Sequence, residues 1–99
     1  MDIKTLQEQV KALRDAQGWH DMSAEQTVAF LTSEMGEVAR EVLKLSGAYG
    51  PVDISAVKQE LGMEIYDVMW NLCDLANMLD IDLEAAFARK VEINRNRKW

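Results

Sequence analysis

Six carboxylates recur at helical spacing in two segments of this 99-residue chain. Three lie within residues 31–42, LTSEMGEVAREV, and three within residues 58–72, KQELGMEIYDVMWNL. They are Glu34, Glu37, Glu41, Glu60, Glu64 and Asp67. At about 100° per residue, each set falls on one narrow strip of a helix that is otherwise largely apolar. Solvent faces usually mix charges, because like-charged pairs at i, i+4 destabilise a helix by about 0.2–0.5 kcal/mol. The strips therefore indicate either unusual solvent faces or two halves of a cation site.

The spacing within each strip suits a shared metal ion. Residues three apart on a helix have Cβ atoms about 5–6 Å apart, so Glu34 and Glu37 can converge on one ion, as can Glu64 and Asp67. Carboxylate oxygens are hard ligands, which favours Mg²⁺, or Mn²⁺, over zinc. A ferritin-like di-iron centre needs Glu-x-x-His pairs, whereas this chain has one histidine, His20, at a predicted helix junction.

The basic residues indicate a negatively charged ligand. Five of the eleven lysines and arginines fall in the last eleven positions, although the net charge is −6. Lys90, Asn94 and Arg97 are spaced i, i+4, i+7 and share one helix face. Bare carboxylates repel a phosphate, but a divalent ion bridges the two. An acidic protein disfavours nucleic acid, so a small anionic ligand is expected, with an ordinary solvated C-terminal segment as the alternative.

Four helices must position these groups, and the sequence predicts an all-α fold in a single domain over residues 1–99. No strand alternation, internal repeat or linker interrupts the helical periodicity. Capping residues and breakers set the boundaries. A first helix runs from the Asp2 cap to Gly18, a second from the Ser23–Gln26 capping box to about Leu45, a third from Asp53 or Ser55 to roughly Leu79, and a fourth from the Asp82 cap to about Asn96, with a loop at 46–53.

The length of the two middle helices predicts an oligomer. At roughly 22 to 26 residues they span about 33–39 Å, which one short chain cannot cover. A homodimer or a dimer of dimers would complete a helical bundle.

The single cysteine, Cys73, sits in an apolar helical pattern and is expected to be a buried small hydrophobe. No apolar run approaches the roughly 18 residues of a membrane span, and MDIKTLQEQV does not resemble a signal peptide, so a cytoplasmic protein without membrane partners is expected.

Three motifs in order resemble the MazG-like all-α nucleoside triphosphate pyrophosphohydrolases. They are SEMGEV, EIYDVMWNLCDLANMLDIDLEAAF and KVEINRNRKW, within a resemblance that covers about residues 23–99. The resemblance implies a Mg²⁺-dependent enzyme that cleaves a (deoxy)nucleoside triphosphate between the α and β phosphorus atoms, releasing a monophosphate and pyrophosphate. Family members are dimers or tetramers.

The resemblance also implies roles for individual residues. Glu34, Glu37, Glu64 and Asp67 would be the catalytic metal ligands, with water as the nucleophile. The phosphates would contact Lys90, Asn94 and Arg97, across a subunit boundary. Two positions depart from the family pattern: Met63 where many members carry a second acid, and Asn71 where members often carry an aromatic residue.

Base recognition is expected from residues near the helix junction. Trp19 and His20 can stack on a nucleobase, and Asn71, one turn beyond Asp67, can reach the sugar or base. For Tyr66 and Trp70, core packing is the favoured interpretation.

The leading functional hypothesis is a housecleaning enzyme acting on noncanonical or surplus (d)NTPs. A related alternative is a phosphoribosyl-ATP pyrophosphohydrolase. An alternative of another class is a noncatalytic helical module that binds a divalent ion.

Overall fold

The computed structural model describes residues 1–98, and within them the chain consists of four α-helices without a β-strand. The helices are α1 (Ile3–Gln17), α2 (Ala24–Leu45), α3 (Ile54–Met78) and α4 (Leu83–Arg95). The predicted all-α class is confirmed, and each predicted helix boundary lies within a residue or two of the observed one.

The helix ends are fixed by the side chains that the sequence placed there. The Asp2 carboxylate accepts a hydrogen bond from the Thr5 backbone N–H at 2.8 Å. Ser23 and Gln26 form the complete capping box at the start of α2. Gly18 ends α1 with φ of 69°, in the left-handed region that favours glycine. Local capping chemistry therefore sets where these helices begin and end.

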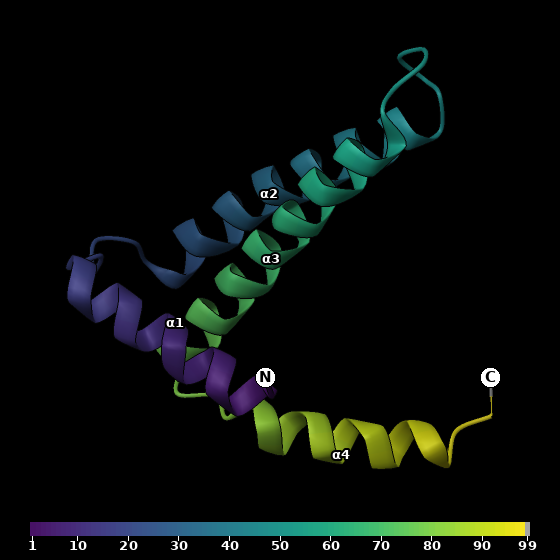
Figure 1. Cartoon of the computed structure of the whole chain (residues 1–99). Coiled ribbons are helices and arrows are strands. Elements are labelled where there is room, and N and C mark those ends of the chain that lie inside the picture. Colours follow the sequence, from purple (N-terminus) through teal and green to yellow (C-terminus); the bar gives the residue numbers. More distant parts are fainter. Residues whose placement is uncertain (99) are drawn as a thin grey trace.

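An antiparallel hairpin of α2 and α3 is the main body of the chain (Figure 1). Helix α1 packs across the C-terminal half of α3, while α4 extends away from the hairpin and contacts mainly α1. Gln7 joins these parts, because its Nε2 donates to the Ile81 carbonyl and its Oε1 accepts from the Leu83 N–H. The hairpin thus presents α2 and α3 side by side, with the acidic strips in reach of each other.

The core of the single chain is small. Leu6 and Val10 of α1 pack against Cys73 of α3, with Trp70 and Leu83 at the edge. The predicted burial of Cys73 is confirmed, and that burial raises the pKa of its thiol. A buried thiol of raised pKa is a poor nucleophile, so Cys73 contributes packing rather than chemistry.

Much apolar surface remains uncovered. The radius of gyration is 16.3 Å, compared with about 13 Å for a compact domain of this length. No side chain of α4 is fully buried, and its Phe87, Val91 and Ile93 are all exposed. None of the helices in residues 1–98 combines the length and the apolar character that a membrane span requires.

Candidate metal centre

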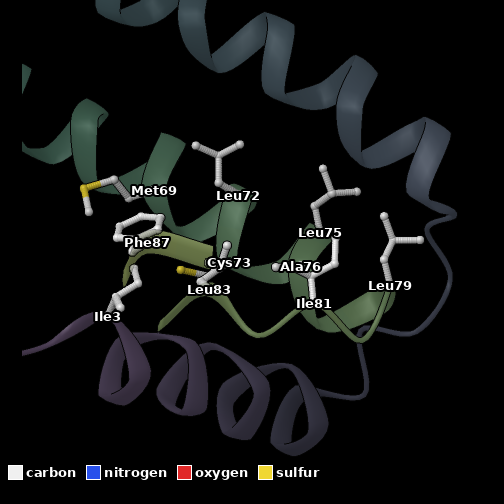
Figure 2. A pocket seen from close by; sticks show the side chains of 10 residues that line it. All are labelled: Ile3, Met69, Leu72, Cys73, Leu75, Ala76, Leu79, Ile81, Leu83 and Phe87. Carbon is white, nitrogen blue, oxygen red and sulfur yellow. The ribbon is translucent and has the colours of Figure 1, made fainter. Parts of the chain in front are cut away.

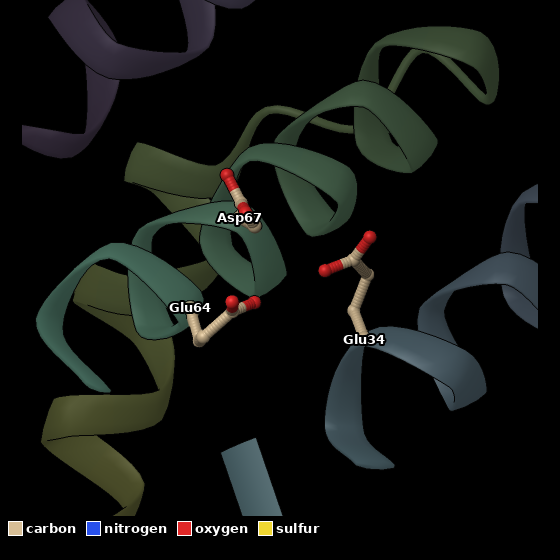
Figure 3. A group of neighbouring side chains, drawn as sticks. All are labelled: Glu34, Glu64 and Asp67. Atoms are coloured by element: carbon tan, nitrogen blue, oxygen red, sulfur yellow. The ribbon is translucent and has the colours of Figure 1, made fainter. Parts of the chain in front are cut away.

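Three of the predicted acidic residues meet between α2 and α3. Glu34 projects from α2 toward α3, which carries Glu64 and Asp67 (Figure 3). Each residue offers one carboxylate oxygen, and the three oxygens all lie within 4.8 Å of one another. Glu34 and Glu64 are half-buried, and Asp67 is exposed. A hard oxygen donor set of this kind fits Mg²⁺ or Mn²⁺.

The electrostatics of the cluster favour a cation. Loss of hydration raises the pKa of Glu34, and the nearby Asp67 and Glu37 raise it further. Loss of hydration also raises the pKa of Glu64, with added repulsion from Asp67, Glu37, Glu34 and Glu60. Every charge that shifts these two pKa values is negative. A divalent ion among the carboxylates would remove this repulsion.

The fourth predicted ligand, Glu37, lies one helical turn beyond Glu34 and is half-buried. Its charge reaches the cluster, as its effect on both pKa values shows. However, its carboxylate is not among the three that converge. Glu60, one turn before Glu64, is exposed and also lies outside the group. The structure therefore brings three of the four predicted ligands together and leaves Glu37 beside them.

Glu41 has a different environment from the cluster. It is buried, with 6% of its surface exposed, and its Oε1 accepts a hydrogen bond from the Lys44 Nζ at 2.9 Å. The other carboxylate oxygen, Oε2, has no hydrogen-bond partner in the described part of the chain. Glu41 is thus a buried, ion-paired residue of α2 rather than part of a solvent face.

An aromatic cavity of about 360 Å³ adjoins the cluster. Its lining residues are Leu13, Trp19, Phe30, Glu34, Tyr66, Asp67, Trp70 and Asn71. Trp19 and Trp70 meet edge to face, with ring centroids 6.1 Å apart and an interplanar angle of 68°. The predicted base contacts Trp19 and Asn71 lie here, whereas His20 is exposed and does not line this cavity.

One of the two aromatic residues expected in the core, Tyr66, differs from that expectation, whereas core packing is confirmed for Trp70. Tyr66 is exposed and lines the cavity beside Asp67, because α3 is not covered on this side within one chain. Trp70 is half-buried and packs against the core while also lining the cavity. Phe30 was missed by the sequence reasoning, since its position on α2 gives no sign of what it faces across the hairpin.

The three predicted phosphate contacts are not near the acidic cluster of the same chain. Lys90 and Asn94 are exposed on α4, and Arg97 follows its end. Helix α4 extends away from the α2–α3 hairpin that carries the carboxylates (Figure 1). One chain therefore presents acidic and basic residues in separate places.

The raised pKa of Glu64 leads to a stability prediction. Because the folded chain disfavours the ionised carboxyl, metal-free Glu64→Gln should melt a few degrees higher than wild type at pH 7. The difference should vanish below about pH 4.3, the ordinary pKa of glutamate, where wild-type Glu64 is protonated in both states. Circular dichroism melts across this pH range in EDTA measure it. With saturating Mg²⁺ the order should reverse, and a variant that melts lower than wild type in EDTA at pH 7 would contradict the repulsion.

The chain is similar in sequence to two curated proteins. Uncharacterized protein YpjD of Bacillus subtilis (strain 168) is 45% identical over 64 residues, which cover 63% of this chain and 55% of the relative. Gene 37 protein of Mycobacterium phage L5 is 34% identical over 68 residues, covering 69% of this chain and 60% of that protein. The chain thus spans only somewhat more than half the length of either relative.

No solved structure gives a significant match to the chain. The family model of the MazG nucleotide pyrophosphohydrolase domain, however, matches residues 22–98. That range includes the converging carboxylates of α2 and α3 and all of α4. The chain belongs to the MazG nucleotide pyrophosphohydrolase domain family.

Proposed function

We propose that the chain is a Mg²⁺-dependent nucleotide pyrophosphohydrolase that cleaves (deoxy)nucleoside triphosphates to monophosphates and pyrophosphate. A housecleaning role on noncanonical or surplus nucleotides is the form of this activity that we favour. The observation that carries the proposal is the convergence of three carboxylates from two helices beside an aromatic cavity. Family membership supports the same class of hydrolase.

Different residues of the chain would bind the ion, accept a proton from the attacking water and hold the base. Glu34, Glu64 and Asp67 would hold the divalent ion, with Glu37 close enough to join them. When bound, the ion would neutralise phosphate charge and polarise the phosphoryl oxygens. Glu34 or Glu64 would accept a proton from the attacking water. The water oxygen would form a bond to the α phosphorus. At the same time the bond between the α phosphorus and the oxygen that bridges it to the β phosphorus would break, and pyrophosphate would leave.

The aromatic side chains would hold the nucleoside. Stacking of a base on an aromatic ring is worth about 1–3 kcal/mol and tolerates different bases. Trp19 and Trp70 present such rings next to Asp67. This placement would set the triphosphate at the carboxylates and the base in the cavity.

A panel of substrates tests the proposal. Canonical and modified nucleoside triphosphates and phosphoribosyl-ATP are incubated with the protein in Mg²⁺ or in EDTA, and pyrophosphate is measured. We expect equimolar monophosphate and pyrophosphate from triphosphates in Mg²⁺ and none in EDTA. Faster cleavage of phosphoribosyl-ATP than of every triphosphate would assign the chain to histidine biosynthesis instead. A folded protein that releases no pyrophosphate from any of them would favour the noncatalytic module.

We further propose that the chain works as a homodimer or a dimer of dimers. An apolar groove of about 310 Å³ runs between α1, α3 and α4, and every residue that lines it is apolar (Figure 2). Leu72, Leu79 and Phe87 of this groove are each about half exposed. Burial of apolar surface contributes about 25 cal/mol per Å², so a second copy that covers the groove would stabilise both chains.

The expected mass in solution is at least twice the 11.3 kDa of the chain. Phe87→Asp should shift the protein toward the monomer and lower its melting temperature, because the charge would lie in the covered groove. Light scattering after size exclusion measures the mass, with the exposed Glu84→Gln on the same helix as control. A monomeric wild-type protein at micromolar concentration would contradict the proposal.

A further inference from the structure

A second cavity shares lining residues with the aromatic one. It has a volume of about 310 Å³ and is lined by Arg14, Trp19, Asp21, Met22, Phe30, Trp70, Asn71 and Asp74. Trp19, Phe30, Trp70 and Asn71 line both cavities. The two cavities therefore adjoin, with the carboxylates of the candidate metal centre at one end and a buried polar group at the other.

The buried polar group is an ion pair between α1 and α3. The Arg14 Nη1 donates a hydrogen bond to the Asp74 Oδ2. Asp74 is only 3% exposed, and its second oxygen, Oδ1, has no hydrogen-bond partner among residues 1–98. An unpaired buried acceptor is costly, and native structures usually explain one by a ligand, an ion or a water. The Asp74 carboxylate therefore needs a donor that the chain does not supply.

Asn71 places a second acceptor on the same side of the cavity. Its Nδ2 donates to the Asp67 carbonyl at 2.8 Å, and Asn71 is 8% exposed. This bond orients the amide, so Oδ1 is left as an acceptor that no donor in the described chain uses. Asn71 and Asp74 are three residues apart on α3, which puts the two side chains side by side. Both residues line the second cavity, and each keeps one acceptor without a donor from the described part of the chain.

We propose that Asn71 and Asp74 select nucleobases with an exocyclic amino group on the pairing edge, as in cytosine and adenine. An amino group has two N–H donors, which can satisfy both acceptors at once. A carbonyl at the same ring position, as in uracil or hypoxanthine, has only lone pairs and would be repelled by both. A site built to hydrogen-bond a substrate group discriminates strongly against the analogue that lacks it. This inference rests on the proposed function and adds the class of base.

Arg14 would be a positioning residue in this site. Its guanidinium holds Asp74 by one oxygen and so directs the other toward a ligand donor. Its charge also opposes the loss of hydration that raises the pKa of Asp74. Asp74 Oδ1 is covered by neighbouring side chains. A base edge reaches it only when the connection between α1 and α2, which bears Trp19 and Met22, shifts. Those two side chains are 51% and 41% exposed.

Two matched pairs of substrates test the inference. The values of kcat/KM are measured for dCTP against dUTP and for dATP against dITP, since each pair differs by one amino group replaced with a carbonyl. We expect the amino-bearing substrate to be favoured at least about tenfold in both pairs. Asp74→Asn introduces an N–H donor and should reduce both ratios toward one. Asp80→Asn makes the same chemical change at an exposed residue that does not line this cavity and should leave both ratios unchanged.

The outcomes separate this inference from the proposed function. Robust turnover with ratios near one in wild type would overturn the base selection and leave the hydrolase intact. Unchanged ratios in a folded Asp74→Asn protein would overturn the assignment to Asp74. If that variant does not fold, Asn71→Ala removes the other acceptor and should also lower both ratios, so unchanged ratios there would overturn the inference. If no triphosphate is cleaved, calorimetry with dCMP and dUMP decides: equal affinity, or none for either, would overturn it.

Discussion

Replacement of Glu64 by glutamine is expected to lower Mg²⁺-dependent pyrophosphate release by at least about a hundredfold. The exchange keeps the size of the side chain but removes one of three carboxylates whose oxygens lie within 4.8 Å of one another. Lewis-acid stabilisation by a bound ion is worth several kcal/mol, and each 1.36 kcal/mol is tenfold in rate. Initial rates at saturating nucleotide over a Mg²⁺ titration measure the loss, and circular dichroism reports whether the helices persist.

The matched control for this result is Glu60→Gln. Glu60 lies one turn earlier on α3, is exposed and does not belong to the converging group, so the rate of the Glu60→Gln variant should stay near wild type.

Glu37→Gln tests the fourth predicted ligand, because Glu37 lies beside the cluster but is not one of the three converging carboxylates. We expect a loss of the same order as for Glu64, with Glu37 moving in when the ion binds. Near-normal rates in both Glu37→Gln and Glu64→Gln would contradict the metal assignment.

Helix placement could be read from the sequence because it depends on local chemistry. Asp2, Ser23, Asp53 and Asp82 each accept a hydrogen bond from a backbone N–H three residues ahead. Gly18 supplies the left-handed residue that ends α1. These interactions span only a few residues, so spacing alone is enough to find them. The contribution of two helices to the acidic cluster could also be predicted from the sequence, since each strip follows from helical periodicity.

The cavities could not be predicted in the same way, because their walls come from distant parts of the chain. Arg14 and Asp74 are sixty residues apart in sequence and meet only because α1 crosses α3. Phe30 joins Trp19 and Trp70 only when α2 and α3 form a hairpin. Periodicity places a residue on a helix face but does not say what that face meets.

Glu41 illustrates the same limit within a single helix. It shares a strip with Glu34 and Glu37, so its spacing gives no reason to expect a different environment. In the structure it is buried and paired with Lys44, whereas Glu34 faces the carboxylates of α3. The difference arises from the position along the α2–α3 hairpin, where the neighbours of one strip change from turn to turn. Burial of a charge is a property of the packed pair of helices, not of the strip.

The second large effect concerns the basic residues on α4 and just after its end, and it is tested with a mixture of two impaired variants. Lys90→Ala/Arg97→Ala should lower kcat/KM at least about tenfold, because each hydrogen bond between a charged group and phosphate contributes about 1.5–3 kcal/mol. Within one chain, α4 extends away from the acidic cluster (Figure 1). We therefore expect the basic residues of one copy to serve the carboxylates of another.

Refolding this double variant together with Glu64→Gln in equal amounts should restore activity. Random pairing makes about half of the dimers mixed, and one of the two sites in each mixed dimer combines intact carboxylates with an intact α4. The mixture should thus reach about a quarter of the wild-type rate, well above either variant refolded alone. If both groups acted within the same chain, each site would keep one defect and mixing would restore nothing. The recovered fraction therefore distinguishes a site shared between copies from a site that α4 completes by folding back onto its own hairpin.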